Sequence, residues 1–244
     1  MVGRGEGLDT TLDPVLDVKL ALWVFLGLLP LDIALVLLDA LHLQALAGHA
    51  PGWLRNDIFG MHLELGLAEG FEYLKSLVTA VAVGLLARRR RALILWVLCG
   101  LNAWMVLDNA LALHERVGQR LARDVLDGLT LGLDRSRDLG ELICFGLVGG
   151  GFLGLLALTW RSASPVARRT TVILAAAIAG AAVFGVGVDA FHASPWANGL
   201  GELLDQAEDG GESVMISLGC ALALGCLAAA RVAVRATNAR FAVN

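Results

Sequence analysis

Carboxylate and imidazole side chains recur at matching positions in this sequence, each time near one end of a long apolar segment. Asp39 and His42 are three residues apart, and Asp189 and His192 repeat that spacing. Residues at i and i+3 share a helix face, so each pair would present a carboxylate beside an imidazole. Together, such side chains from neighbouring helices form the ligand set of zinc, iron and manganese. The sequence therefore predicts a divalent metal site whose ligands are drawn from Asp39, His42, Glu72, Asp108, Asp189, His192 and Glu212. The alternative is that these side chains form only a polar network.

A second pattern, an acid followed three positions later by glutamate, occurs at Glu69–Glu72, Asp138–Glu141 and Asp209–Glu212. Acids at the start of a helix also cap free N–H groups and favour the helix dipole, so capping is an open alternative for Glu141 and Asp209. Ser213 and Ser217, four residues apart beside Glu212, either bind a substrate or link helices, and the link is favoured. The secondary candidates are Glu69, His114, Glu115, Glu141, Asp209 and Ser213.

Two ionisable residues lie deeper within the apolar segments. Asp32 is near the middle of the first segment. Lys75 lies three positions after Glu72, and we expect these two side chains to form an ion pair on one helix face.

The composition identifies the elements that must hold these residues. The chain has 244 residues, of which 57% are hydrophobic and 17% charged, whereas an ordinary soluble domain is about 25% charged. This excludes a soluble enzyme, a nucleic-acid-binding module, a disordered chain and a disulfide scaffold. Runs of about 20 apolar residues are long enough to cross a bilayer as helices. We predict six spans, at 20–43, 66–87, 92–114, 140–160, 170–192 and 212–234.

The predicted fold is therefore an all-α membrane bundle of six helices arranged as three hairpins. A polar N-terminal segment (1–19) precedes one membrane domain (20–236), and a short tail (237–244) follows it. Between the third and fourth spans, residues 116–133 have the pattern of an amphipathic helix lying on the membrane surface.

Lysine and arginine set the orientation, because they concentrate in cytoplasmic loops. One side of the predicted bundle holds the block Arg88–Arg91, and both termini lie on that side. The complete set there is Arg4, Lys19, Arg88–Arg91, Arg161, Arg168, Arg169, Arg231, Arg235 and Arg240. We expect both termini to be cytoplasmic and the acid–histidine cluster to face the other side of the membrane. The N-terminus lacks the pattern of a cleaved signal peptide.

Three functions fit these features. The leading one is metal binding at the cluster, and a metal with an open coordination position would support hydrolysis of a lipid-like substrate. The first alternative is a transporter coupled to protons or ions, since clustered carboxylates can relay protons. The second is a non-catalytic subunit of a larger membrane complex. The expected partners are the lipid bilayer, a small amphiphilic ligand and a membrane protein. The scattered basic residues argue against nucleic acid.

The segments Asp108–Glu115, Val188–Phe191 and Leu204–Ser213 resemble those of a loose group of bacterial multi-spanning membrane proteins. The resemblance covers about the last three-fifths of the chain. It implies a bacterial origin, hence the inner membrane, and a helical membrane fold, but no particular activity. A more distant analogy is with the alkaline ceramidases and progestin/adiponectin-type receptors, which are seven-span proteins with a zinc site. This sequence departs from them in having six predicted spans and no His-x-x-x-His element.

Overall fold

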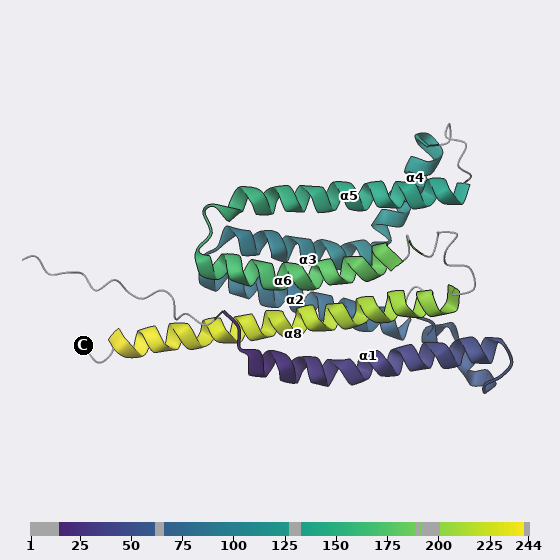
Figure 1. Ribbon diagram of the computed structural model, residues 1–244, viewed down its shortest axis with the longest axis horizontal. Helices are drawn as coiled ribbons and strands as arrows, with labels where there is room; N and C mark the ends of the chain where they lie inside the picture. Colours follow the sequence, from purple (N-terminus) through teal and green to yellow (C-terminus); the bar gives the residue numbers. More distant parts are fainter. Residues whose placement is uncertain (1–14, 62–65, 127–132, 189–190, 192–200, 242–244) are drawn as a thin grey trace, which may run out of the picture.

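The computed structural model describes residues 15–61, 66–126, 133–188, 191 and 201–241, and all regular structure in these ranges is helical. The helices are α1 (Val18–Leu46), α2 (Leu67–Arg90), α3 (Leu93–Leu111), α4 (Leu113–Asp124), α5 (Leu133–Trp160), α6 (Pro165–Ala182) and α8 (Gly201–Phe241) (Figure 1). Short 3-10 turns, Gly52–Arg55 and Asp57–Phe59, follow α1, and a π-helical segment, Val183–Val188, follows α6. Every α-helix except α4 is long and apolar enough to cross a membrane. The prediction of an all-α, multi-spanning membrane bundle is confirmed.

Local sequence signals set several helix ends. The Asp17 side chain accepts a hydrogen bond from Leu20 N at 3.0 Å and so caps the first turn of α1. Ser164 caps α6 in the same way, accepting from Ala167 N at 3.2 Å. At the end of α2, Arg91 adopts a left-handed conformation with φ of 49°. That residue reverses the chain direction, and as a result α2 and α3 are antiparallel neighbours.

The third predicted span is shorter than expected at its far end. It was predicted over 92–114, but α3 ends at Leu111 because Ala112 takes a left-handed conformation with φ of 46°. Consequently His114 and Glu115 belong to α4 and not to the end of a span. The surface helix expected over 116–133 begins earlier, at Leu113, and residues 127–132 lie outside the described part of the chain.

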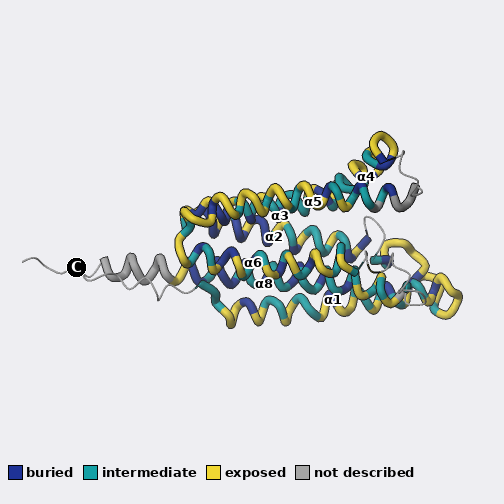
Figure 2. The backbone as a smooth tube through the Cα atoms, turned by 45° about the horizontal axis from the view of Figure 1, so that its top comes forward, coloured by how far each residue is buried: buried dark blue, intermediate teal, exposed yellow. Residues whose placement is uncertain are grey.

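Helix α8 is the central element of the bundle. It packs along α1, α2 and α6, and much of its length is buried (Figure 2). Its backbone comes close to α1, because a Cβ at Gly225 would lie 2.9 Å from Asp17 O and Asp17 N donates to Gly225 O at 3.1 Å. Small residues allow such close approach of helices in lipid. Helix α1 therefore packs mainly against the last helix and only slightly against α2, an arrangement that the order of the chain does not indicate.

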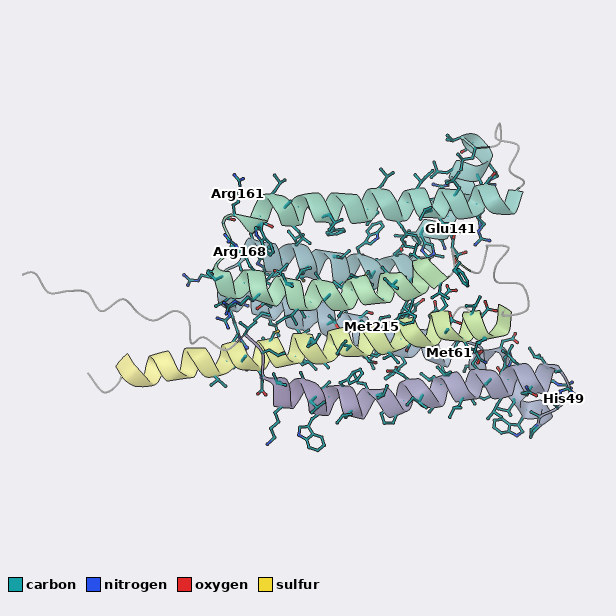
Figure 3. All side chains as sticks on the ribbon, in the orientation of Figure 1. His49, Met61, Glu141, Arg161, Arg168 and Met215 are labelled. Atoms are coloured by element: carbon teal, nitrogen blue, oxygen red, sulfur yellow. The ribbon has the colours of Figure 1, made fainter. Side chains whose placement is uncertain are left out.

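The two ends of the bundle differ in chemistry. Arg161 and Arg168 lie at the end that we call the arginine end, and Glu141 and His49 lie toward the opposite end, which we call the loop end (Figure 3). The half of the bundle next to the arginine end is filled by buried apolar side chains of α2, α3, α6 and α8. They include Leu86, Leu95, Leu98, Leu174 and Leu227. Polar side chains gather in the other half and at mid-depth, where the candidate site lies.

Candidate functional site

A buried ion pair links α1 to α2 in the interior of the bundle. Lys75 Nζ lies 2.8 Å from Asp32 Oδ1, and the two side chains are only 2% and 0% exposed. Asp32 is fourteen residues from each end of α1, which at 1.5 Å per residue places it about 21 Å from either end. The ion pair therefore lies near the middle of a membrane-spanning helix, where ionised side chains are costly and rare.

Helix α8 completes the network around this ion pair. Lys75 Nζ also donates to Ser213 O at 2.9 Å and to Ser213 Oγ at 2.8 Å. Ser217 Oγ donates to Asp32 Oδ2 at 2.6 Å, and Ser213 Oγ donates to Asp32 Oδ1 at 3.1 Å. All three donors of the ammonium group are thus used. We call Asp32, Lys75, Ser213 and Ser217 the polar centre. It joins α1, α2 and α8 through charge-assisted hydrogen bonds, which are stronger than neutral ones.

This arrangement corrects the predicted partner of Lys75. The sequence favoured an ion pair with Glu72 on the same helix, but Lys75 forms its ion pair with Asp32, forty-three positions away. The physical reason is burial: Asp32 is fully enclosed at mid-helix and needs a cation there. The Lys75 ammonium also lies 4.6 Å from the centre of the Phe71 ring.

Two glutamates lie next to the polar centre, toward the loop end. Glu72 of α2 and Glu212 of α8 interact electrostatically with each other, with Lys75 and with Asp209. Both side chains are half-buried. We call Glu72 and Glu212 the acid pair. The structure thus brings two of the predicted metal ligands together, along with the secondary candidates Asp209 and Ser213.

The π-helical segment after α6 makes room for the acid pair. A Cβ at Gly185 would collide with the Glu212 carboxylate, so only glycine fits at this position without a shift of its neighbours. Single π-helical turns are frequent at functional sites. The absent side chain at Gly185 lets the Glu212 carboxylate lie directly against the backbone of the Val183–Val188 segment.

Asp39 and His42 lie at the far end of α1, against the connection to α2. Asp39 Oδ1 accepts from Met61 N at 3.0 Å, and His42 Nδ1 lies 2.7 Å from Leu54 O. Both side chains are buried, at 3% and 1% exposure. They hold the connection against α1. Asp189 and His192, which the sequence groups with them, lie outside the described residues.

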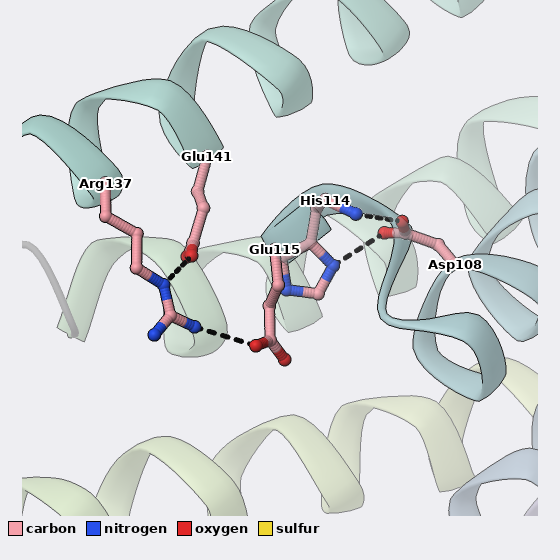
Figure 4. Close-up of polar contacts among 5 residues, drawn as sticks. All are labelled: Asp108, His114, Glu115, Arg137 and Glu141. Atoms are coloured by element: carbon pink, nitrogen blue, oxygen red, sulfur yellow. Dashed lines mark hydrogen bonds and ion pairs between the residues drawn. The ribbon is translucent and has the colours of Figure 1, made fainter. Parts of the chain in front are cut away.

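A third group of polar residues joins α3, α4 and α5 (Figure 4). Asp108 accepts from His114 N at 2.9 Å, and its other oxygen lies 3.1 Å from His114 Nδ1. Arg137 donates to Glu115 at 2.7 Å and to Glu141 at 2.8 Å. Asp108 thereby holds the first turn of α4, where backbone N–H groups need acceptors. Glu141 pairs with Arg137.

The described candidates therefore fall into three groups and not into one pocket. Glu72 and Glu212 flank the polar centre, Asp39 and His42 lie at the end of α1, and Asp108 pairs with His114. The secondary candidate Glu69 accepts a hydrogen bond from Tyr73. Within the described ranges, no group of three or more histidines, cysteines and acids is arranged to hold a metal ion.

Sequence reasoning left Asp32 and Lys75 out of the predicted metal site and weighed Ser217 only together with Ser213. A signal was present, since Asp32 and Lys75 are ionisable residues of opposite charge inside apolar segments. Such residues in membrane helices usually pair with one another. The partner helix was not predictable, because the pairing joins residues from the first, second and last helices.

These features define a class: a multi-spanning helical membrane protein with a buried ion-pair network beside half-buried carboxylates. The chain belongs to the family described as a domain of unknown function, DUF8692, which matches residues 28–230. Comparison with curated proteins and with solved structures finds no match.

Proposed function

We propose that the protein is a membrane transporter coupled to protons or cations, with the acid pair taking up the ion beside the polar centre. The observation that carries this proposal is the fully buried ion pair of Lys75 and Asp32, at 2% and 0% exposure, with two further carboxylates next to it. Ionisable groups inside a membrane bundle mark ion or substrate pathways.

Charge balance supports the uptake of a positive ion. Asp32, Glu72 and Glu212 bring three carboxylates to one place, and Lys75 brings one ammonium group. Excess negative charge inside a low-dielectric bundle is expensive. A proton or a metal cation on the acid pair restores the balance, and its binding and release couple the site to the bulk solution.

The distribution of polar side chains supports access to the site from the loop end. Glu69 and Asp209 continue the polar side chains toward the loop end, whereas apolar residues fill the half next to the arginine end. In a transporter with alternating access, this conformation is the one closed toward the arginine end. The arginine bias supports placing that end in the cytoplasm of a bacterial cell, with both termini inside.

We expect purified protein in vesicles to move protons or alkali cations under an imposed gradient, measured with a pH-sensitive dye and with cation-sensitive dyes in the lumen. Glu72→Gln and Glu212→Gln remove the carboxylates that take up the ion, so flux should fall to the level of empty vesicles. Glu115→Gln is the matched control, because Glu115 pairs with Arg137 outside the acid pair. Wild-type flux equal to that of empty vesicles, or unchanged flux in both acid-pair variants, contradicts the proposal.

Metal binding near the loop end is a second candidate, supported by the setting of His42. Its Nδ1 lies 2.7 Å from Leu54 O. Metal-ligating histidines typically donate one ring nitrogen to a carbonyl while the other binds the metal. Asp39 lies one turn away, and Asp189 and His192 are the ligands predicted to complete the set with zinc, iron or manganese. An open position on that metal would support hydrolysis of an amphiphilic substrate.

We expect elemental analysis of the purified protein to find close to one metal ion per chain if this second candidate is correct. His42→Ala should lose the ion, because one ligand disappears, and a chelator should lower the melting temperature of the wild type but not of this variant. His49→Ala, an exposed histidine of the same loop region, should keep it. A metal content near zero in the wild type rules the candidate out.

The remaining alternative from the sequence, a non-catalytic subunit of a larger membrane complex, stays a prediction.

A further inference from the structure

Helix α4 has no part in the proposed function, and it lies against α5 near the loop end of the bundle (Figure 1). Within the described side chains, Leu139–Trp160 is the stretch of α5 long and apolar enough to cross a membrane, and the charged stretch 134–138 precedes it in the sequence. Gly140, near the start of this stretch, touches α4: a Cβ there would lie 2.6 Å from Gly118 O. A helix in contact with the first residues of a span lies at the depth of the lipid headgroups.

Contacts on one side of α4 fix its rotation about its own axis. Gly118 and Ala122 are buried, and Glu115 pairs with Arg137 of α5 at 2.7 Å. His114 packs on the Phe145 ring, with the ring centres 4.8 Å apart. These residues occupy one face of α4, so the opposite face must point away from the bundle.

Three arginines occupy that opposite face. Arg116, Arg120 and Arg123 are spaced four and three residues apart, which places them in one stripe. At 100° per residue, the stripe is centred opposite Gly118. All three side chains are exposed, and Arg123 Nε donates to Gln119 O at 3.2 Å. We call Arg116, Arg120 and Arg123 the arginine stripe.

We propose that the arginine stripe binds the phosphate groups of anionic phospholipids in the leaflet at the loop end. Guanidinium groups bind phosphate oxygens in bidentate fashion, and the headgroup layer is what surrounds a helix at this depth. Val117 borders the stripe at 38% exposure. Its apolar side chain fits the boundary with the acyl chains, as in other surface helices of membranes.

The test places a fluorophore on α4 and asks which lipid surrounds it. Gln119→Cys is labelled in the full-length protein; the native cysteines are buried or half-buried, so the introduced thiol is the one that reacts. Vesicles contain phosphatidylcholine with a small fraction of spin-labelled phosphatidylglycerol or, in parallel, of spin-labelled phosphatidylcholine. We expect quenching by the anionic lipid to be roughly two- to fivefold stronger, in line with the attraction of one basic residue to an anionic surface.

The combined change Arg116→Gln, Arg120→Gln and Arg123→Gln should bring the two quenching values to the same level. The matched control removes three exposed arginines at the other end of the bundle: Arg88→Gln, Arg89→Gln and Arg91→Gln. It should leave the preference at α4 unchanged. Two results overturn the proposal. One is equal quenching of the fluorophore by both lipids in protein that keeps the three arginines. The other is a preference for the anionic lipid that remains after the three arginines are replaced. Because this readout does not involve transport, it is independent of the proposed function.

Discussion

Replacement of Lys75 by methionine should lower the free energy of unfolding by about 3–5 kcal/mol, the cost of removing one partner of a buried ion pair. Asp32 is 0% exposed, so the remaining carboxylate cannot reach water. Two serine hydroxyls still donate to it, but neither carries a balancing positive charge. The measurement is equilibrium unfolding of the purified protein in mixed micelles with increasing sodium dodecyl sulfate.

Two further variants separate the ion pair from general damage. Lys19→Met changes the other lysine of the chain, which is exposed, and should leave stability unchanged. Adding Asp32→Asn to Lys75→Met removes both charges, and most of the lost stability should return, since replacing a whole buried pair is often nearly neutral. Equal stabilities for Lys75→Met and the wild type would mean that the ion pair does not form in the membrane protein.

Gly140→Ala should separate α4 from α5 and lower the free energy of unfolding by about 1–3 kcal/mol, the usual cost of overpacking. The added Cβ would lie 2.6 Å from Gly118 O and 2.9 Å from Gly118 Cα. Both are backbone atoms, so no side chain can rotate away to relieve the overlap. The same unfolding titration measures the loss, and proteolysis of the α4 segment should become faster.

The matched control for Gly140→Ala lies on the same helix. At Gly149 an added Cβ meets nothing within 4 Å, so Gly149→Ala should be neutral or raise stability by up to about 1 kcal/mol through helix propensity. If both variants lose the same stability, glycine matters in α5 for its general flexibility and not for close contact with α4. Loss of the lipid preference at α4 in Gly140→Ala would further link this contact to the arginine stripe.

The lengths of the apolar segments were enough to assign the protein to the helical membrane class. Apolar runs long enough to cross a bilayer predicted six membrane helices, because a helix rises a fixed distance per residue. The acids and histidines near the ends of those runs predicted where polar side chains gather. The pairing of Glu72 with Glu212 beside Ser213 was within reach of this reasoning, since all three lie at similar depth on segments expected to be close together.

Which helices are neighbours became known from the folded chain and not from the sequence. Asp32 of α1 can reach Lys75 of α2 because both helices pack against α8. The packing of α1 against α8 depends on close backbone contacts such as the one at Gly225. Lipid offers no hydrophobic preference among apolar helix faces, so shape and interhelical hydrogen bonds select the neighbours. A left-handed residue at Ala112 likewise moved His114 and Glu115 onto α4. Hydrophobic periodicity and composition predict neither the packing of α1 against α8 nor the left-handed residue at Ala112. The partners of the charged side chains therefore could not be assigned from the sequence.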